Sequence, residues 1–260
     1  MKLKIFIANA FSNKKFGGNP AAVVPLNEWL SDRLMQQIAE QNNLAETAYI
    51  IPQGDDYAIR WFTPVVEVDL CGHATLASAH IMFEHLGYSR DQIIFHSKSG
   101  LLRVRRNQGK ITLDFPADEP EKIPDLELID KALGIKSSKV FKSRFDYMVV
   151  LESQSYIETL KPDLTLINKL PGRGLIVTAK GDNVDFVSRC FFPQSGIDED
   201  PVTGSAHVVM APYWAKQMGK NKLSAIQLSS RRGYLDCELA GDRVLISGHA
   251  HTYLEGDFYI

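Results

Sequence analysis

Two short segments of the chain carry the residues best placed for chemistry. The first reads CGHAT at residues 71–75 and the second reads TGSAH at residues 203–207. Each is typical of a helix start, where the first backbone N–H groups have no partner within the helix and carry about half a positive charge. Such a start suits a bound carboxylate or phosphate. The residues expected to hold an anion at these two starts are Gly72, Ala74, Gly204 and Ser205.

The small residues at these starts also have a purely structural explanation. Glycine and alanine let a buried helix begin close to another stretch of backbone, and either start alone is most simply explained in this way. The occurrence of two matching starts in one chain favours a binding site, because both could serve one ligand in a cleft between two halves of the protein.

The two segments belong to an internal repeat. Gly72 aligns with Gly204 and Gly87 with Gly219, 132 residues apart in each case. Both stretches read as helices that begin at the first glycine and end with the second at the C-cap. The residues between the glycines are mostly apolar or small, which predicts a helix buried on most sides.

The repeat continues on both sides of these helices. Downstream of each helix an alternating strand, a glycine-containing turn and a second alternating strand are expected. Upstream of each helix lies a hairpin, and before the hairpin a strand followed by a helix. The matched segments are 95–113 with 228–246, 49–64 with 174–193, and 20–43 with 146–170. Strands around one buried helix, present twice, predict a duplicated α+β architecture.

The expected seam between the two halves is the proline-rich and acidic stretch at 115–127. We expect an N-terminal half at residues 1–118, which holds the first central helix. The C-terminal half at residues 119–260 holds the second, and its final strand could pack back on the first half.

Composition excludes several classes of protein. The 260 residues are 45% hydrophobic and 23% charged with a formal net charge of −2, which argues against a nucleic-acid binder. No apolar stretch approaches the roughly 20 residues of a membrane helix, and the N-terminus lacks a secretory signal. Three cysteines are too few for a disulfide framework, so a reducing cytoplasm is the expected location.

Four blocks of the sequence resemble the signature blocks of the phenazine-biosynthesis-type isomerases (PhzF-like), which share their fold with diaminopimelate epimerase. The resemblance implies two mirrored halves, each a barrel-like sheet around a central helix, with the active site at their interface. It also implies a small carboxylate-bearing substrate, no cofactor and a homodimer. The blocks are FGGNPAAVV (16–24), NNLAETAYI (42–50), WFTPVVEVDLCGHATLASAH (61–80) and DEDPVTGSAH (198–207).

By this resemblance Glu46 is the general acid and base, which removes a proton from one substrate carbon and returns one to another. A loop glutamate exposed to water is the alternative, and it is the usual fate of glutamate. The matching place in the second half, KLPGRGLIV at 169–177, contains no acid. An acid in only one half of a repeat favours function.

Three further side chains are expected to hold the substrate. His73 can bind a carboxylate or relay a proton, or it can be a satisfied histidine in a helix turn. Asp200 can bind substrate or assist proton transfer, and it can also cap the second helix. Asn19 is either a turn residue or a substrate ligand, with the two roles evenly matched. Asp198 and Glu199 are expected to do no more than help cap the second helix.

Cys71 is ambiguous. Related racemases and epimerases use two opposed cysteines, one at each helix start, and Cys71 fits the first. Its mate would fall near Thr203, where the sequence has no cysteine. Cys71 is therefore expected to be a small buried packing residue.

No metal site is predicted from the histidines. His73 and His80 share a helix face and His249 and His251 share a strand face, but neither pair has a third ligand nearby in sequence.

The leading hypothesis is a cofactor-independent isomerase that shifts a proton at carbon through Glu46, with His73, Asp200 and Ser205 holding the substrate. A one-base amino-acid epimerase assisted by Cys71 is the alternative enzyme. A binding protein that retains the cleft without catalysis is the alternative outside enzymes.

Overall fold

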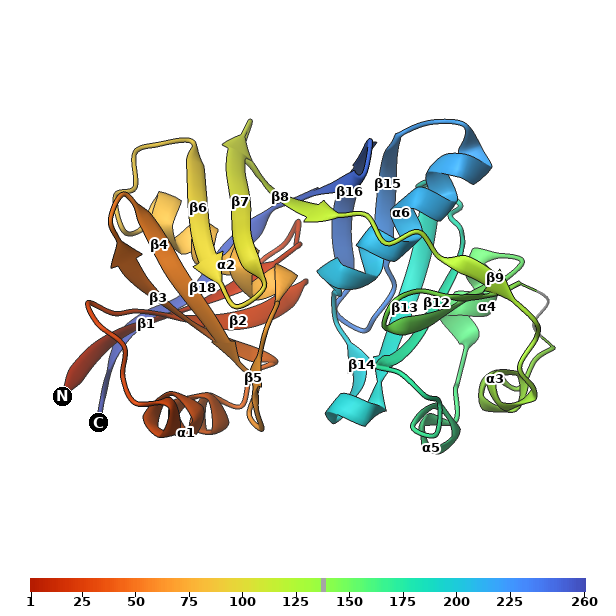
Figure 1. The fold of residues 1–260 in the computed structure, drawn as a ribbon, viewed down its shortest axis with the longest axis horizontal. Helices are drawn as coiled ribbons and strands as arrows, with labels where there is room; N and C mark the ends of the chain where they lie inside the picture. The colour runs from red at the N-terminus through yellow and green to blue at the C-terminus, as the bar shows by residue number, and fades with distance from the viewer. Residues whose placement is uncertain (137–138) are drawn as a thin grey trace. The chain divides into compact units, whose positions relative to one another are not determined.

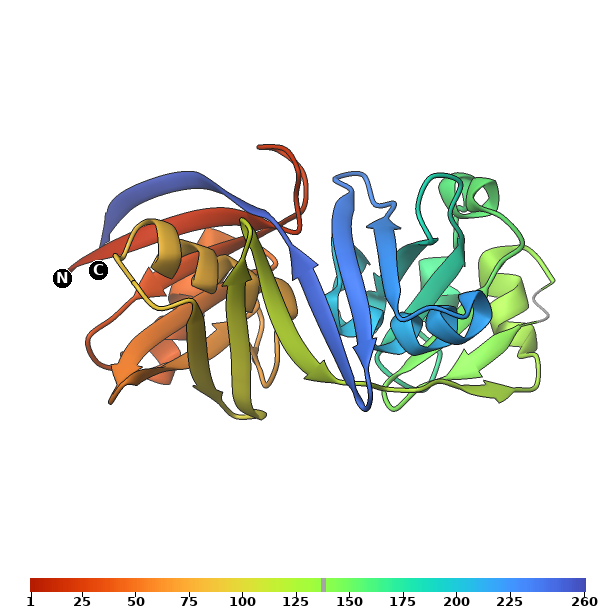
Figure 2. The ribbon, with the colours of Figure 1, turned by 90° about the horizontal axis from the view of Figure 1, so that it is seen from above.

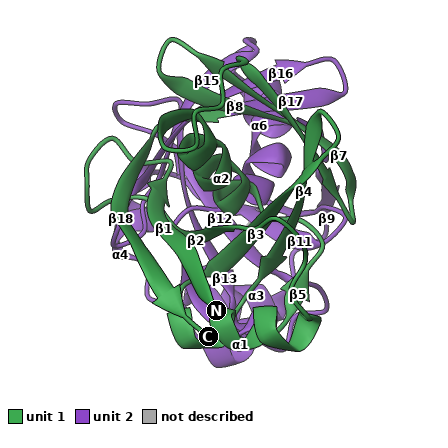
Figure 3. Ribbon diagram, turned by 90° about the vertical axis from the view of Figure 1, so that its left-hand side faces the viewer, with its two compact units in different colours: residues 1–114, 247–260 green, residues 115–246 purple. Residues whose placement is uncertain are grey.

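The computed structural model describes residues 1–136 and 139–260, which fall into two compact units. Unit 1 comprises residues 1–114 and 247–260, and unit 2 comprises residues 115–246 (Figure 3). The chain thus crosses from unit 1 to unit 2 and returns, so its C-terminal segment is part of unit 1.

Unit 1 contains one helix enclosed by strands and one helix outside them. Its helices are α1 (Asp32–Asn42) and α2 (Gly72–Glu84). Its strands are β1 (Lys2–Ala10), β2 (Asn19–Pro25), β3 (Glu46–Gln53), β4 (Asp56–Phe62), β5 (Glu67–Val68), β6 (Gln92–Ser97), β7 (Gly100–Asn107), β8 (Lys110–Pro116), which continues into unit 2, and β18 (Ala250–Tyr259).

The strands of unit 1 pair in the order β18, β1, β2, β3, β4, β6, β7, β8. Two of these pairings are parallel, β2 with β3 and β4 with β6, and the others are antiparallel. Parallel neighbours need a crossover connection, which usually contains a helix. α1 lies in the first crossover and α2 in the second, so the pairing explains where each helix falls.

Unit 2 repeats this plan. Its strands are β9 (Glu121–Ile123), β10 (Val140–Lys142), β11 (Asp146–Val150), β12 (Gly174–Lys180), β13 (Phe186–Phe192), β14 (Ile197–Asp200), β15 (Lys222–Gln227), β16 (Gly233–Ala240) and β17 (Arg243–Gly248), which continues into unit 1. Its helical segments are α3 (Glu127–Leu133), α4 (Gln154–Thr159), α5 (Leu164–Ile167), η1 (Pro193–Ser195) and α6 (Gly204–Met218).

The pairing of unit 2 matches that of unit 1 strand for strand. β11 is parallel to β12 across α4 and α5, and β13 is parallel to β15 across α6. β9 with β10, β10 with β11, β12 with β13, and β15 with β16 are antiparallel. The predicted duplicated α+β architecture is therefore confirmed.

α2 is the central helix of unit 1. Every residue from Gly72 to Ala79 is buried, and the helix contacts β1, β2, β3 and β18 (Figure 3). Its two buried hydroxyls are satisfied within the helix, because Thr75 donates to the carbonyl of Cys71 and Ser78 to that of Ala74. The hydroxyl groups of Thr75 and Ser78 can thus be enclosed without being left unpaired.

The two central helices begin at Gly72 and Gly204, as predicted. α6 ends as expected with Gly219 in the left-handed conformation at its C-cap. The prediction that Gly87 caps α2 is wrong, because α2 ends at Glu84 with His85 as its C-cap. The amides of His85 and Leu86 both donate to the carbonyl of Ile81, which unwinds the last turn before Gly87 is reached.

The single helix expected after the strand in the segment 146–170 is also wrong. The segment forms two short helices, α4 and α5, separated by residues 160–163. Pro162 lies in this gap, and a proline disfavours the helical conformation of the residue before it. Asp163 then starts α5 by accepting a hydrogen bond from the amide of Leu166 at 3.1 Å.

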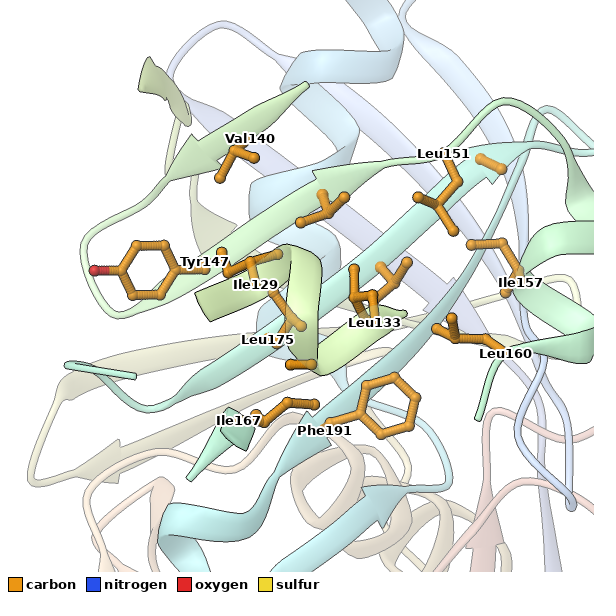
Figure 4. Close-up of a cluster of buried hydrophobic side chains, with 14 of the residues drawn as sticks. Ile129, Leu133, Val140, Tyr147, Leu151, Ile157, Leu160, Ile167, Leu175 and Phe191 are labelled. Carbon is orange, nitrogen blue, oxygen red and sulfur yellow. The ribbon is translucent and has the colours of Figure 1, made fainter. Parts of the chain in front are cut away.

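The remaining helices cover the outside of the sheets. In unit 2, α3, α4 and α5 pack on β11, β12 and β13 through one hydrophobic cluster (Figure 4). In unit 1, α1 lies outside the strands (Figure 1) and buries Met35, Ile38 and Ala39 against Tyr49 and Phe62. These spacings place the apolar residues on one face of α1. The two ends of the chain lie side by side in this unit, where β1 pairs with β18 (Figure 2). The members of the unit 2 cluster labelled in Figure 4 are Ile129, Leu133, Val140, Tyr147, Leu151, Ile157, Leu160, Ile167, Leu175 and Phe191.

Within residues 1–136 and 139–260, none of the helices combines the length and the apolar character needed to cross a membrane.

Candidate active site

Glu46 is the first residue of β3, and the end of α1 places it there. Asn43 follows α1 in the left-handed conformation, with φ of 48°, and turns the chain toward β3. β3 then runs parallel to β2 with Glu46 opposite Ala21. Glu46 is buried, with 8% of its surface exposed, so it is not the exposed loop glutamate of the alternative interpretation.

His73 is the second residue of α2 and lies among three polar side chains. Its Nε2 is 2.9 Å from Oε2 of Glu46. Its Nδ1 is 3.2 Å from Nδ2 of Asn19 and 3.6 Å from Sγ of Cys71. The four residues form one buried group in unit 1, called here the Glu46 cluster: Asn19, Glu46, Cys71 and His73.

His73 and Glu46 are in close contact, but their atoms do not have the geometry of a hydrogen bond. Although the two atoms lie 2.9 Å apart, neither Nε2 of His73 nor Oε2 of Glu46 has a partner in hydrogen-bond geometry. Both atoms are buried, and a buried polar atom without a hydrogen bond is costly. Such groups in a native fold point to a ligand or to chemistry.

The electrostatic environment of His73 is set by burial and by its neighbours. Burial alone would lower the pKa of His73, but Cys71 and Glu46 outweigh it and hold that pKa well above its ordinary value. Burial also raises the pKa of the Cys71 thiol. Because a neutral thiol attracts an imidazolium only weakly, we assign the raised pKa of His73 chiefly to the carboxylate of Glu46.

Asn19 begins β2 and is fully buried. The structure places it against His73. A side-chain amide can offer either its oxygen or its NH2 group to a ring nitrogen. Asn19 can therefore orient His73 in both the neutral and the protonated state.

Cys71 is the N-cap residue of α2 and is buried, as a packing residue would be. It does more than pack, because its Sγ contacts the ring of His73. Gly72 and Ala74 follow it in the first turn and are also buried, so their amides belong to the same surroundings as the Glu46 cluster.

The start of α6 in unit 2 carries a different polar group. Asp200 is buried and is the last residue of β14. Its Oδ2 accepts a hydrogen bond of 2.5 Å from the hydroxyl of Thr203, which is the N-cap residue of α6. Gln227 accepts from the amide of Thr203 at 2.8 Å and donates to the backbone carbonyl of Asp200 at 2.7 Å. Gly204 and Ser205 open the helix beside this group.

Strand pairing identifies equivalent positions in the two units. Glu46 of β3 lies opposite Ala21 of β2, and Gly174 of β12 lies opposite Asp146 of β11, so Gly174 is the equivalent of Glu46. A Cβ atom at Gly174 would lie 2.3 Å from the carbonyl oxygen of Phe191. Unit 2 therefore has no room for an acid at this position.

The position of Asp200 also differs between the two units, but here unit 2 carries the acid. Asp200 lies opposite Cys190 of β13, and the equivalent pair in unit 1 is Val68 opposite Trp61. Glu46 and Asp200 are thus acids at positions where the other unit has glycine and valine, respectively.

Sequence reasoning missed Gln227 and the contact between Thr203 and Asp200. Gln227 is fully buried in β15, where Leu223 and Ala225 alternate inward before it. A polar residue at an inward position of an alternating strand was the available signal.

The two acids next to Asp200 lie outside this group. Glu199 forms a two-bond ion pair with Arg189, at 2.7 and 2.8 Å, and Asp198 is exposed. The ion pair with Arg189 thus gives Glu199 a structural role within this acid-rich stretch.

Comparison with known proteins agrees with this fold. The sequence model of the family described as phenazine biosynthesis-like protein matches residues 8–256. An uncharacterized isomerase of Pseudomonas aeruginosa is 48% identical over 260 residues, 100% of both chains. A crystal structure from Enterococcus faecalis, described as a phenazine biosynthesis protein of the PhzF family, matches with a TM-score of 0.97 and 45% identity over 100% of both chains.

A more distant structure shows how widely the fold is shared. A hydroxyproline epimerase of Agrobacterium vitis matches with a TM-score of 0.64 at 10% identity, over 98% of this chain and 92% of that chain. This likeness concerns the fold alone. Two repeated units, each with strands around a central helix, define the class of proteins with the diaminopimelate-epimerase fold. Within that class, the chain belongs to the phenazine biosynthesis-like (PhzF) family of isomerases.

Proposed function

We propose that this chain is a cofactor-independent isomerase that moves a proton between carbon atoms of a small carboxylate-bearing substrate. Glu46 takes the proton from one carbon and delivers it to another, as a general base and then a general acid. The substrate loses and regains one proton, so no electron acceptor or donor enters the balance.

The observation that carries this proposal is the buried carboxylate of Glu46, 2.9 Å from Nε2 of His73. A proton carrier needs a group that is shielded from bulk water and free to exchange its hydrogen-bond partner. Oε2 of Glu46 meets the second condition, because its contact with Nε2 of His73 lacks hydrogen-bond geometry and can be exchanged for a contact with substrate. Before the first transfer, His73, with its raised pKa, offsets the charge of the Glu46 carboxylate. Once Glu46 has taken the proton, the same imidazolium can offset the negative charge left on the substrate.

Substrate binding is assigned to the helix starts. The amides that follow Gly72 have the partial positive charge that suits a carboxylate. In unit 2, Asp200, Ser205 and the amides that follow Gly204 are proposed to bind the same substrate. This second assignment follows from the family resemblance and from the chemistry of a helix start.

Deuterium exchange tests the proposal. The protein is incubated in heavy water with a panel of small cyclic and linear carboxylic acids, and deuterium at carbon is measured by mass spectrometry and NMR. We expect wash-in at carbon with the wild type and none without protein. A non-catalytic binding protein would bind an acid from the panel and leave its carbon-bound hydrogens unchanged.

Two further properties are proposed with their own tests. Cofactor independence predicts that exchange survives exhaustive dialysis and treatment with a chelator. A loss of exchange that returns only with a metal or an organic cofactor would contradict it. The homodimer expected from the family resemblance is tested by light scattering of the purified protein.

A one-base epimerase assisted by Cys71 is the second candidate. The 3.6 Å contact between Sγ of Cys71 and Nδ1 of His73 favours it, because a thiol there can pass a proton to the imidazole. An epimerase returns the proton to the same carbon and inverts it, whereas a proton-shift isomerase moves a double bond. Product analysis separates the two, and a large loss of turnover in Cys71→Ser would support the epimerase.

A further inference from the structure

Three side chains of the Glu46 cluster come together in a way that the sequence did not suggest. A carboxylate oxygen of Glu46, Sγ of Cys71 and a ring nitrogen of His73 lie within 4.8 Å of one another. Their residues are 8%, 6% and 5% exposed. Among residues 1–136 and 139–260, this is the one set of three or more potential ligands with such spacing.

The donor set has the chemistry of a zinc site. Thiolate, imidazole and carboxylate are the three side-chain ligands of Zn2+ in proteins, and three protein ligands leave a fourth position open. The thiolate distinguishes such a site from one for Mg2+ or Ca2+, which take oxygen ligands. The two negative ligands would balance the charge of a divalent cation, with the thiol and imidazolium protons released to solvent.

The spacing is compatible with small movements of the side chains. Ligands of a tetrahedral zinc ion lie roughly 3.5 Å apart, given metal–ligand distances of about 2.0 to 2.3 Å. In this structure Sγ of Cys71 is 3.6 Å from one ring nitrogen of His73, and Oε2 of Glu46 is 2.9 Å from the other. A single ion would bind only one of these two ring nitrogens. The side chain that lies nearer the other nitrogen, either Cys71 or Glu46, would then have to move toward the ion.

A second observation points to a ligand at the same place. Oε2 of Glu46 and Nε2 of His73 are buried and lack an aligned hydrogen bond. A cation bound between them would satisfy both atoms at once.

We propose that Glu46, Cys71 and His73 form a binding site for Zn2+ in unit 1. Because the ion occupies the carboxylate of Glu46, its binding excludes proton transfer by that residue. This inhibitory consequence depends on the proposed function, whereas the binding itself does not.

Metal binding is tested directly and without substrate. The chelator-stripped protein is titrated with Co2+, a spectroscopic stand-in for Zn2+, and the sulfur-to-metal charge-transfer absorption is recorded. Zn2+ affinity is measured by competition with a chelating dye. The structure predicts one equivalent of metal, a thiolate band, and loss of the band in Cys71→Ser with affinity for Zn2+ reduced more than about 10-fold. Cys237→Ala removes a buried cysteine of unit 2 and should leave both unchanged.

Glu46→Gln provides a second, independent variant. An amide is a poorer zinc ligand than a carboxylate, so affinity should fall while the thiolate band of the Co2+ form remains. Circular dichroism checks that each variant is folded. Absence of the band in the wild type, or its persistence in Cys71→Ser, would overturn the site.

Inhibition is measured separately from binding. Once exchange has been detected with the metal-free wild type, one equivalent of Zn2+ should abolish it and chelator should restore it. Metal binding without any effect on exchange would overturn the inhibitory role. Failure to find an exchanged substrate bears on the proposed function and leaves the binding measurements intact.

Discussion

The two central helices each bury one histidine near their start, and the two histidines differ in what surrounds them. His73 of α2 has Glu46, Asn19 and Cys71 as neighbours, and its pKa is raised well above the ordinary value. His207 of α6 donates from Nδ1 to the backbone carbonyl of Thr203 at 2.8 Å. Burial lowers the pKa of His207 to about 4. Burial alone acts in the same direction on both, so the carboxylate beside His73 accounts for the difference.

This comparison shows how one duplicated framework can serve two purposes. The strand pairing and the helix start are common to both units, and a few side chains differ. Unit 1 has Glu46 and His73 where unit 2 has Gly174 and Ser205. In the proposed function, these substitutions suit the start of α2 to proton transfer and the start of α6 to substrate binding.

Of the variants considered, Glu46→Gln is expected to have the largest effect on the difference between the two histidines, because it removes the charge beside His73. Because its folded pKa is raised, protonated His73 stabilises the fold below its ordinary pKa, and this contribution is lost as pH rises through the folded value. In Glu46→Gln burial is no longer opposed by a carboxylate, so the pKa of His73 should fall. NMR titration of the ring protons measures this pKa, and Glu199→Gln, which removes an acid of unit 2, is the control that should leave the pKa of His73 unchanged. An unchanged titration in Glu46→Gln would contradict the electrostatic assignment.

His207 should show the opposite dependence on pH. Its folded pKa of about 4 lies below the unfolded value, so its contribution to stability is present above about pH 6.5 and is lost as pH falls toward 4. The loss amounts to about 3 kcal/mol by pH 4. His207→Asn keeps a donor for the carbonyl of Thr203 and cannot titrate. In urea unfolding at several pH values, the free energy of unfolding of this variant should fall less steeply between pH 6.5 and pH 4 than that of the wild type. An equally steep fall in both proteins would refute the interpretation.

Gly174→Ala tests whether unit 2 excludes a side chain at the position of Glu46. The added Cβ would lie 2.3 Å from the carbonyl oxygen of Phe191, so backbone has to shift. We expect a loss of roughly 1 to 3 kcal/mol in the free energy of unfolding, measured by urea denaturation. Gly256→Ala is the control, because its Cβ would meet only Leu254, at an ordinary 3.7 Å. Equal stabilities of the two variants would show that glycine is not required.

Asp200→Asn should have the smallest of these effects. Asparagine keeps an acceptor for the hydroxyl of Thr203 but removes the charge, and a hydrogen bond to a charged group is worth about 1.5 to 3 kcal/mol. We expect kcat/KM to fall about tenfold or somewhat more, with weaker substrate binding as part of the loss. Asp198→Asn, which changes an exposed acid two residues away, should leave kcat/KM unchanged. A similar loss in both variants would indicate a general effect of charge.

The repeat and the helix starts could be predicted from sequence because they depend on local chemistry. Glycines near the ends of a helix of small residues, and turn residues between alternating strands, can be recognised directly in the sequence. The family resemblance points to Glu46, and the repeat supports that choice because the matching segment at 169–177 contains no acid. The break at Pro162 had a local signal as well, and the apolar spacing on both sides of it obscured that signal.

The contacts within the site depend on packing between distant segments. Asn19, Glu46 and Cys71 come from β2, β3 and the segment before α2, and only the folded sheet brings them to His73. Gln227 reaches Thr203 from a strand 24 residues downstream. No spacing in the sequence reports which way a side chain turns once its strand is buried, so these partners could not be named in advance.

The most direct test of the central claim is the rate of deuterium exchange at carbon in Glu46→Gln. Glutamine has nearly the shape and hydrogen-bonding reach of glutamate but cannot carry the proton. With any acid that the wild type exchanges, we expect Glu46→Gln to lower the rate by about 10²- to 10⁴-fold and to leave substrate binding nearly unchanged. Exchange at a near-normal rate in a folded Glu46→Gln protein would contradict it and would place the proton carrier on another residue.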